Sequence, residues 1–192
     1  MSLIELKQAL LREEVIMIKT KDEEPFTLES GKKSRLFINI KKASLNPCIL
    51  KCMVKQILKS ITIKYDYCDL IGSVAIGGIP IASALSYAAC MPQIIVRTEK
   101  HDRGMKTQII GNCDYQDVLL IEDVSTTGES IINAVKAIRN AKGICNYCIV
   151  IVDRDEGAIE KCKNNKIELI PLLSKKDFGI TEDDDKRNCL IK

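Results

Sequence analysis

The amino-acid sequence predicts an α/β fold in which a parallel sheet is flanked by helices. Several short apolar runs, such as residues 118–121, lack polar alternation and are typical of strands buried on both faces. These runs alternate with helical patterns, as the crossover connections of a parallel sheet require. The 192 residues have the length of one domain. We therefore expect residues 1–192 to form a single domain with a small amino-terminal lid (1–45), a ligand-binding core (66–173) and a polar tail (179–192).

Hydrophobic periodicity and turn residues place the elements in order along the chain. Pro47 suits the first turn of a helix, because a helix does not need its N–H there. The charged run 98–111 has no apolar periodicity, so we expect a mobile loop there. In chain order, the expected elements are a helix over 3–18, two short strands on either side of Ser30-Gly31, a helix over 47–63, a strand–glycine-loop–helix unit over 69–90, a strand over 93–97, a strand at 118–121 with a helix over 129–141, a strand within 148–153 with a helix after it, and a last strand over 167–173.

The charge balance points to a small anionic ligand. There are 29 basic and 26 acidic residues, and a net charge of +3 argues against bulk binding to nucleic acid or to a membrane surface. No apolar run reaches the length that spans a bilayer. The amino terminus lacks the compact apolar segment of a signal peptide, so we expect a cytoplasmic protein.

The cysteines favour reduced thiols. Their number is odd, nine, and they are scattered along a chain without an export signal. Cys145 and Cys148 form a CxxC pair, but there is no second pair and His101 is the one histidine. A zinc site would need two more ligands, so we expect no metal there.

The segment VLLIEDVSTTGES, residues 118–130, carries the strongest functional signal. Ligands of open α/β sheets bind at the carboxyl ends of strands, so Glu122 and Asp123 are expected at the rim of the sheet, where they avoid the cost of a buried acid pair. The hydroxyl residues and glycine that follow suit a phosphate at a helix start, although they are also ordinary helix caps. Because two carboxylates repel an anion, the ligand should also carry hydroxyls, a metal or a developing positive charge.

This segment resembles the phosphoribosyl-pyrophosphate (PRPP) motif of the type I phosphoribosyltransferases. Three further segments, FTLESGKKS, AIGGIPIA and VDRDEGA, resemble orotate phosphoribosyltransferases and occur in that family's order, so the similarity spans about residues 20–160. The resemblance implies a type I phosphoribosyltransferase-like fold whose core binds PRPP. It also implies conversion of orotate and PRPP to orotidine 5′-monophosphate and pyrophosphate, in pyrimidine synthesis, with magnesium.

The resemblance also implies how PRPP is bound. Glu122 and Asp123 would face the ribose hydroxyls and stabilise the oxocarbenium-like centre that forms as pyrophosphate leaves. The loop Ala75 to Gly78 would offer backbone N–H groups to pyrophosphate, although Gly77-Gly78 is also typical of a tight turn. Magnesium would be carried by PRPP, without a direct protein ligand. The residues implied for PRPP binding are Ile76, Gly77, Gly78, Arg97, Ser125, Thr126, Thr127, Gly128, Glu129 and Ser130.

Orotate bears a carboxylate, which a guanidinium can bind through two hydrogen bonds. Arg154 in VDRDEG is the residue implied for this role; the alternative is a solvated arginine beside its acidic neighbours. Lys32, Phe37 and Thr126 are also implied for the orotate site. Phe37 could instead belong to the core.

The charged loop departs from the family's pattern, Arg-Lys-Glu-x-Lys-x-His-Gly. Thr98 stands in place of a lysine, His101 in place of the principal loop lysine and Arg103 in place of the histidine. Lys100, His101 and Arg103 are candidate catalytic residues, and Lys106 adds a cation. Only His101 could donate a proton near neutral pH, so no specific general acid is assigned. The alternative is a solvated surface loop.

The family implies a homodimer in which the loop over 98–110 closes on the partner's active site. The alternatives to orotate phosphoribosyl transfer are transfer to another base, a PRPP-sensing regulator and a P-loop kinase. Transfer to another base, such as a purine, is disfavoured by Arg154. A non-catalytic PRPP-sensing regulator is disfavoured by the low net charge and the absence of a DNA-reading helix pattern. A P-loop kinase would require the GxxxxGK[ST] motif, which the sequence lacks.

Overall fold

The computed structural model has a central sheet of six strands. It describes residues 2–20, 22–27, 33–64, 68–97 and 108–180. The strand order is β10-β9-β8-β5-β6-β7, and every neighbouring pair is parallel except β6 and β7. The predicted parallel sheet is therefore confirmed. The strands are β5 (Leu70–Val74), β6 (Gln93–Val96), β7 (Ile109–Ile110), β8 (Asp117–Ser125), β9 (Ile144–Asp153) and β10 (Glu168–Ser174).

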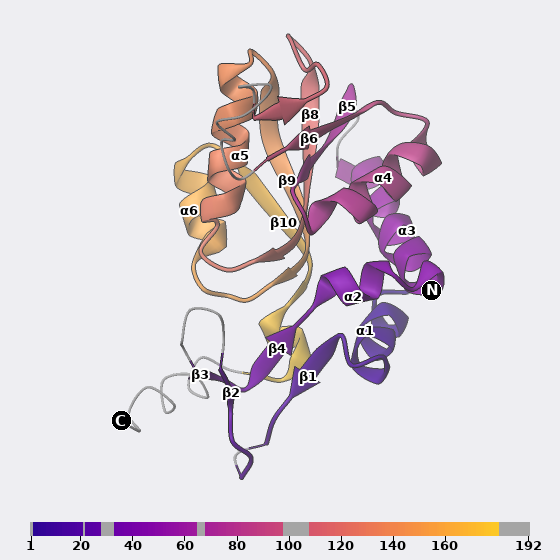
Figure 1. Cartoon of the computed structure of the whole chain (residues 1–192), viewed down its shortest axis with the longest axis vertical. Helices are drawn as coiled ribbons and strands as arrows, with labels where there is room; N and C mark the ends of the chain where they lie inside the picture. The colour runs from indigo at the N-terminus through magenta and orange to yellow at the C-terminus, as the bar shows by residue number, and fades with distance from the viewer. Residues whose placement is uncertain (1, 21, 28–32, 65–67, 98–107, 181–192) are drawn as a thin grey trace.

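Helices cover both faces of the sheet (Figure 1). On one face lie α3 (Pro47–Lys64) and α4 (Gly78–Ala89), and on the other α5 (Glu129–Asn140) and α6 (Ala158–Asn164). Successive side chains of β8 point to opposite faces of the sheet. Leu119 and Ile121 pack in the hydrophobic cluster under α3 and α4, whereas Val118 and Leu120 pack in the cluster under α5. None of the described helices is long and apolar enough to cross a membrane.

Short elements make up the amino-terminal region. They are α1 (Leu3–Arg12), β1 (Ile16–Ile18), β2 (Phe26–Thr27), β3 (Lys33–Ser34), β4 (Leu36–Ile38) and α2 (Ile40–Ser44). Two antiparallel pairs form, β1 with β4 and β2 with β3.

Several elements differ from the expected ones. The helix expected over 3–18 ends at Arg12, since Glu14 has a left-handed φ of 53° and Ile16–Ile18 then pairs with β4. The expected loop over 98–111 contains a strand at its end, because Ile109–Ile110 adds to the edge of β6. The short helix α2 was not expected.

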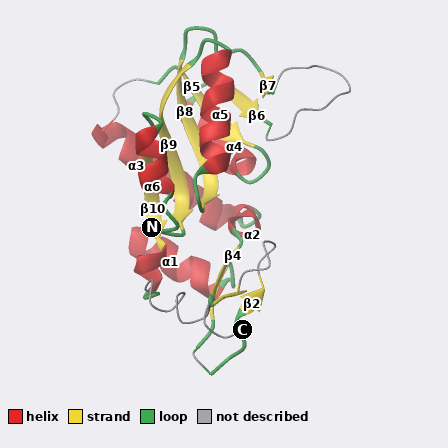
Figure 2. Ribbon diagram, turned by 90° about the vertical axis from the view of Figure 1, so that its left-hand side faces the viewer, coloured by secondary structure: helices red, strands yellow, loops and turns green. Residues whose placement is uncertain are grey.

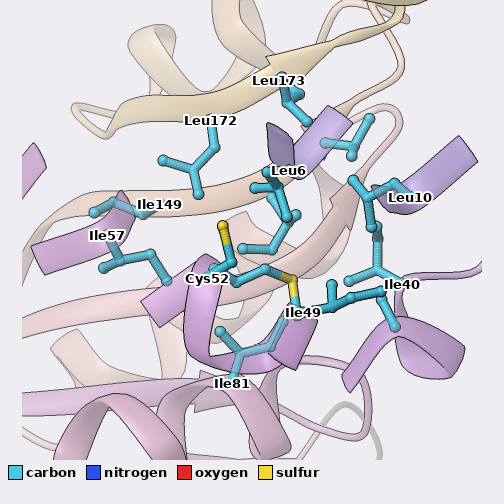
Figure 3. Close-up of a cluster of buried hydrophobic side chains, with 14 of the residues drawn as sticks. Leu6, Leu10, Ile40, Ile49, Cys52, Ile57, Ile81, Ile149, Leu172 and Leu173 are labelled. Atoms are coloured by element: carbon cyan, nitrogen blue, oxygen red, sulfur yellow. The ribbon is translucent and has the colours of Figure 1, made fainter. Parts of the chain in front are cut away.

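The amino-terminal region shares its core with the sheet (Figure 3). Leu6 and Leu10 of α1 are fully buried in the same cluster as Leu172 and Leu173 of β10. Figures 1 and 2 show this region at the end of the sheet to which β10 runs. After β10 comes the 3₁₀ helix η1 (Lys175–Phe178), and Ile180 is only 5% exposed, so residues 179 and 180 belong to the packed structure and not to the expected polar tail. Residues 181–192 lie outside the described part.

Candidate active site

The two acids of the central motif lie within β8, which continues through Ser125. Glu122 is only 5% exposed, so the expectation that both acids sit at the rim was wrong for this residue. Burial is the largest cause that raises the pKa of Glu122 well above its usual range, and the side chain of Asp123 raises it further. The backbone N–H of Asp123 donates to Glu122 Oε1 (3.1 Å), which acts in the opposite direction but does not reverse the shift. The charged form of Glu122 is therefore disfavoured in the folded protein.

Asp123 is half-buried and lies against the glycine loop that follows β5. A Cβ atom on Gly77 would lie 2.2 Å from Asp123 Cγ, and one on Gly78 would lie 2.5 Å from the carbonyl oxygen of Ile121. Residues 75–77 do form a turn, but Gly77 has φ −65°, which other residues also adopt, so the turn alone does not require a glycine at this position. Both glycines are required because the loop packs directly on β8. The loop is open on its other side, where Ile76 is 76% exposed; the Ala75–Ile76 peptide bond is cis.

Ser125 joins the ends of β8 and β9. Its hydroxyl donates to Asp153 Oδ1 (2.6 Å), and its carbonyl accepts from the N–H of Arg154 (2.9 Å). Ser125 and Asp153 are each 1% exposed, and burial raises the pKa of Asp153 although the Ser125 bond lowers it. The expectation that the Ser125 hydroxyl is offered to a ligand was wrong, since this hydroxyl is buried and already bonded.

The start of α5 is open to a ligand. Thr126 and Thr127 are exposed, and the N-cap residue is Gly128, which has φ 78° and no side chain to cap the helix. The alternative that the hydroxyl residues are ordinary caps is therefore wrong for this helix. The first N–H groups of α5 and the positive end of its dipole suit an anion. Glu129, expected to contact PRPP, is exposed and forms an ion pair with Lys161 (2.5 Å).

Arg154 follows β9 and is buried, at 8% exposure. Its Nε donates to Glu156 Oε1 (2.8 Å), and its Nη2 donates to Ser34 Oγ of β3 (3.3 Å). The alternative of a solvated arginine is therefore wrong. Asp155 accepts instead from the backbone N–H of Lys176 (3.3 Å).

Other predicted site residues are placed only in part. Phe37 is half-buried in β4, and its ring centroid lies 5.6 Å from that of Phe26. Arg97 follows β6, where its N–H donates to the carbonyl of Gln108 (2.8 Å). Outside the described residues lie Lys32, Thr98, Lys100, His101, Arg103 and Lys106, so their roles stay predictions.

Of the two residues that contact Arg154, Glu156 was expected beside it as one of its acidic neighbours, and Ser34 was missed. Ser34 lies inside the segment SGKKS, but nothing in that segment distinguishes it from its polar neighbours. Ser34 is 120 residues from Arg154 along the chain, so no local pattern could have paired them.

The two cysteines of the CxxC pair belong to the core under α5. Cys145 and Cys148 are fully buried, and burial raises the pKa of Cys145 to about 12 and that of Cys148 well above its usual range. Within the described ranges no group of three or more His, Cys, Asp or Glu could hold a metal ion. These buried thiols are unreactive core residues.

Comparison with known proteins identifies the family. The family described as "Phosphoribosyl transferase domain" matches residues 51–179. The orotate phosphoribosyltransferase of Methanosarcina mazei is 41% identical over 154 residues, which are 80% of this chain and 81% of that protein. The crystal structure of orotate phosphoribosyltransferase from Aeropyrum pernix has a TM-score of 0.77 at 23% identity, over 90% of this chain and 94% of that one. The Mycobacterium tuberculosis orotate phosphoribosyltransferase in complex with PRPP has a TM-score of 0.72 at 25% identity, over 91% of this chain and 98% of that one. The chain belongs to the orotate phosphoribosyltransferase family of the type I phosphoribosyltransferases.

Proposed function

We propose that this protein, an orotate phosphoribosyltransferase of pyrimidine biosynthesis, transfers the phosphoribosyl group at the carboxyl edge of β8 and β9. The observation that carries the proposal is the contact of Asp123 with Gly77, beside the open start of α5. It puts one carboxylate between the glycine loop after β5 and the start of α5, where an anion can bind. PRPP has the matching groups in the same order: pyrophosphate, ribose hydroxyls and 5′-phosphate.

Each part of PRPP then has a partner of suitable chemistry. The 5′-phosphate binds Thr126, Thr127 and the first N–H groups of α5. The ribose hydroxyls donate to Asp123, and pyrophosphate lies on the backbone of the loop Ile76 to Gly78. The PRPP complex of the M. tuberculosis enzyme, which shares the fold, supports this choice of ligand.

The two acids differ in burial, and the half-buried Asp123 is the one that can face the bond changes. As the anomeric C–O bond to pyrophosphate breaks, positive charge develops on the ribose, and the carboxylate of Asp123 stabilises it. A ring nitrogen of orotate bonds to that carbon, and its proton passes to the departing pyrophosphate or to solvent. Burial raises the pKa of Glu122, which disfavours a second negative charge beside the phosphates.

Magnesium fits this arrangement when it is carried by the pyrophosphate. Mg²⁺ prefers oxygen ligands and keeps waters and substrate phosphates, and Asp123 offers a half-exposed carboxylate beside the pyrophosphate loop. The ion would neutralise charge that builds on the leaving group. Arg97 and the cations of the loop over 98–107 would share that task.

One assay tests the assignment. Orotate consumption is followed with PRPP and magnesium, and uracil, hypoxanthine and guanine are offered as competing bases. We expect turnover of orotate and none of the purines, because Arg154 selects a base with a carboxylate. Turnover of a purine without orotate would contradict the proposal, and PRPP binding without any turnover would support a regulator.

The homodimer with shared sites is tested by mixing two inactive variants. One carries Lys100→Ala with Arg103→Ala and the other Asp123→Asn. If the loop of one subunit serves the other's site, the mixed dimer has one intact site, and mixing recovers up to about half the activity per chain. Complete subunit exchange without recovery would show that the loop serves its own subunit or that its cations are not catalytic.

A further inference from the structure

Two residues from different parts of the chain hold the guanidinium of Arg154. Glu156, two positions further along, accepts from Nε at 2.8 Å. Ser34 of β3 accepts from Nη2 at 3.3 Å, and its own hydroxyl donates to the carbonyl of Leu36 (3.0 Å). The arginine is thus attached both to the loop after β9 and to the amino-terminal strands.

Burial makes these partners necessary. The side chain of Arg154 is 10% exposed and that of Glu156 is 33% exposed. A guanidinium does not lose its proton at accessible pH, and a buried charge without a partner is strongly destabilising. Without Glu156, the arginine would turn toward solvent or toward another acid of the loop, such as Asp153 or Asp155.

The two contacts also select which edge of the guanidinium stays available. Arginine has five N–H groups. Glu156 takes the one on Nε and Ser34 takes one on Nη2. Three N–H groups remain on Nη1 and Nη2, and among the described residues none of them has a partner. A carboxylate can bind two parallel N–H groups of this end.

We propose that Glu156 is a positioning residue that, with Ser34, turns the Nη1–Nη2 end of Arg154 toward the carboxylate of orotate. The proposal rests on the assignment of Arg154 to that carboxylate. Glu156 acts through the arginine, and it contributes to the choice of base without touching the base.

Charge and position predict opposite results, which makes the idea testable. The negative charge of Glu156 offsets the attraction between Arg154 and orotate. If charge alone mattered, removal of Glu156 would lower the KM for orotate. If position matters more, removal raises that KM, because a misplaced guanidinium loses the two-bond geometry.

The experiment measures kcat and both KM values for Glu156→Ala, Glu156→Gln and Ser34→Ala. The matched control is Glu160→Ala, an exposed acid on α6. We expect Glu156→Ala to raise the KM for orotate about tenfold, the effect of losing one hydrogen bond to a charged group, with the KM for PRPP within about twofold of wild type. Glu156→Gln should restore most of the affinity, since its amide oxygen still accepts from Nε. Ser34→Ala should raise the KM for orotate about threefold, and Glu160→Ala should change neither KM.

A lower or unchanged KM for orotate in Glu156→Ala would overturn the proposal, as would equal rises in both KM values or no rescue by glutamine. Arg154→Ala separates this failure from that of the underlying assignment. If Arg154→Ala raises the KM for orotate and Glu156→Ala does not, only the positioning role falls. If Arg154→Ala leaves that KM unchanged, both the assignment and the positioning role are wrong.

Discussion

The loops that follow β8 and β9 share a backbone plan but present different groups to a ligand. Each leads from a parallel strand to a helix whose N-cap is a left-handed glycine, Gly128 (φ 78°) or Gly157 (φ 93°). The loop after β8 exposes two threonines and uncapped N–H groups. The loop after β9 buries the side chain of Arg154, which we propose as its binding group.

This difference is visible in how the two glycines are packed. A Cβ atom on Gly128 would lie 3.2 Å from Cys162 Sγ and 3.3 Å from Ala158 Cα, whereas one on Gly157 would meet nothing within 4 Å. The loop after β8, which we propose binds through its backbone, therefore packs closely on α6. A loop that binds through one side chain needs partners for that side chain.

The largest expected effect is a loss of turnover when the charge of Asp123 in β8 is removed. Asp123→Asn keeps the shape and removes the charge, so kcat should fall on the order of 100-fold with little change in stability. Steady-state kinetics and a thermal melt measure both. Asp117→Asn, on an exposed residue at the start of the same strand, is the control and should keep its kcat. Near-wild-type turnover in Asp123→Asn would contradict the assigned role.

The next largest effect is a loss of orotate affinity when Arg154, after β9, is removed. Arg154→Ala should weaken orotate binding by about 1.5–3 kcal/mol, because a hydrogen-bonded charge is lost, and should leave PRPP nearly unaffected. Binding calorimetry with each substrate measures the difference. Arg139→Ala is a control of another kind, since Arg139 donates to the carbonyls of Cys145, Asn165 and Lys166. It should lower stability without a preference between substrates, and the same result from Arg154→Ala would mean a folding role.

Alanine substitutions of Gly128 and Gly157 compare directly how closely the two loops are packed. Alanine is strained at either left-handed position, which costs about 1–2 kcal/mol. Gly128→Ala should be the more destabilising by about 1 kcal/mol, because its methyl group also crowds α6. Urea unfolding of both variants measures the difference. Equal losses would show that α6 yields without cost and does not support the phosphate loop.

The smallest effect concerns the pH dependence of stability. Burial raises the folded-state pKa of Glu122 well above its ordinary value of 4.5, so the folded state binds its proton more tightly than the unfolded state does. Its favourable contribution is present below pH 4.5 and is lost as pH rises through the folded pKa. Glu122→Gln mimics the protonated form, so its free energy of unfolding should gain on that of wild type as pH rises from about 4.5. A constant difference between the two proteins would contradict the raised pKa.

Local patterns in the sequence determined the repeating parts of this protein. The helix expected over 129–141 is α5 (Glu129–Asn140), and the apolar runs became β5, β8, β9 and β10. Motifs in the family's order were enough to identify the fold and the reaction, since the residues of each motif are neighbours along the chain. Periodicity and motif spacing are local properties, so they can be read from the sequence without knowing which segments pack against one another.

Tertiary structure decided which polar groups are free. The motif marked Glu122 and Ser125 as ligand-facing, but the extension of β8 between its neighbouring strands buried both of them. Ile16–Ile18 continued an apolar helical pattern, yet pairing with β4 made it a strand. Ser34 reached Arg154 only because the amino-terminal strands fold back over the end of β9. Burial and hydrogen-bond partners depend on segments far apart in the chain, and the physical cost of leaving a buried polar group unpaired is settled only when those segments meet.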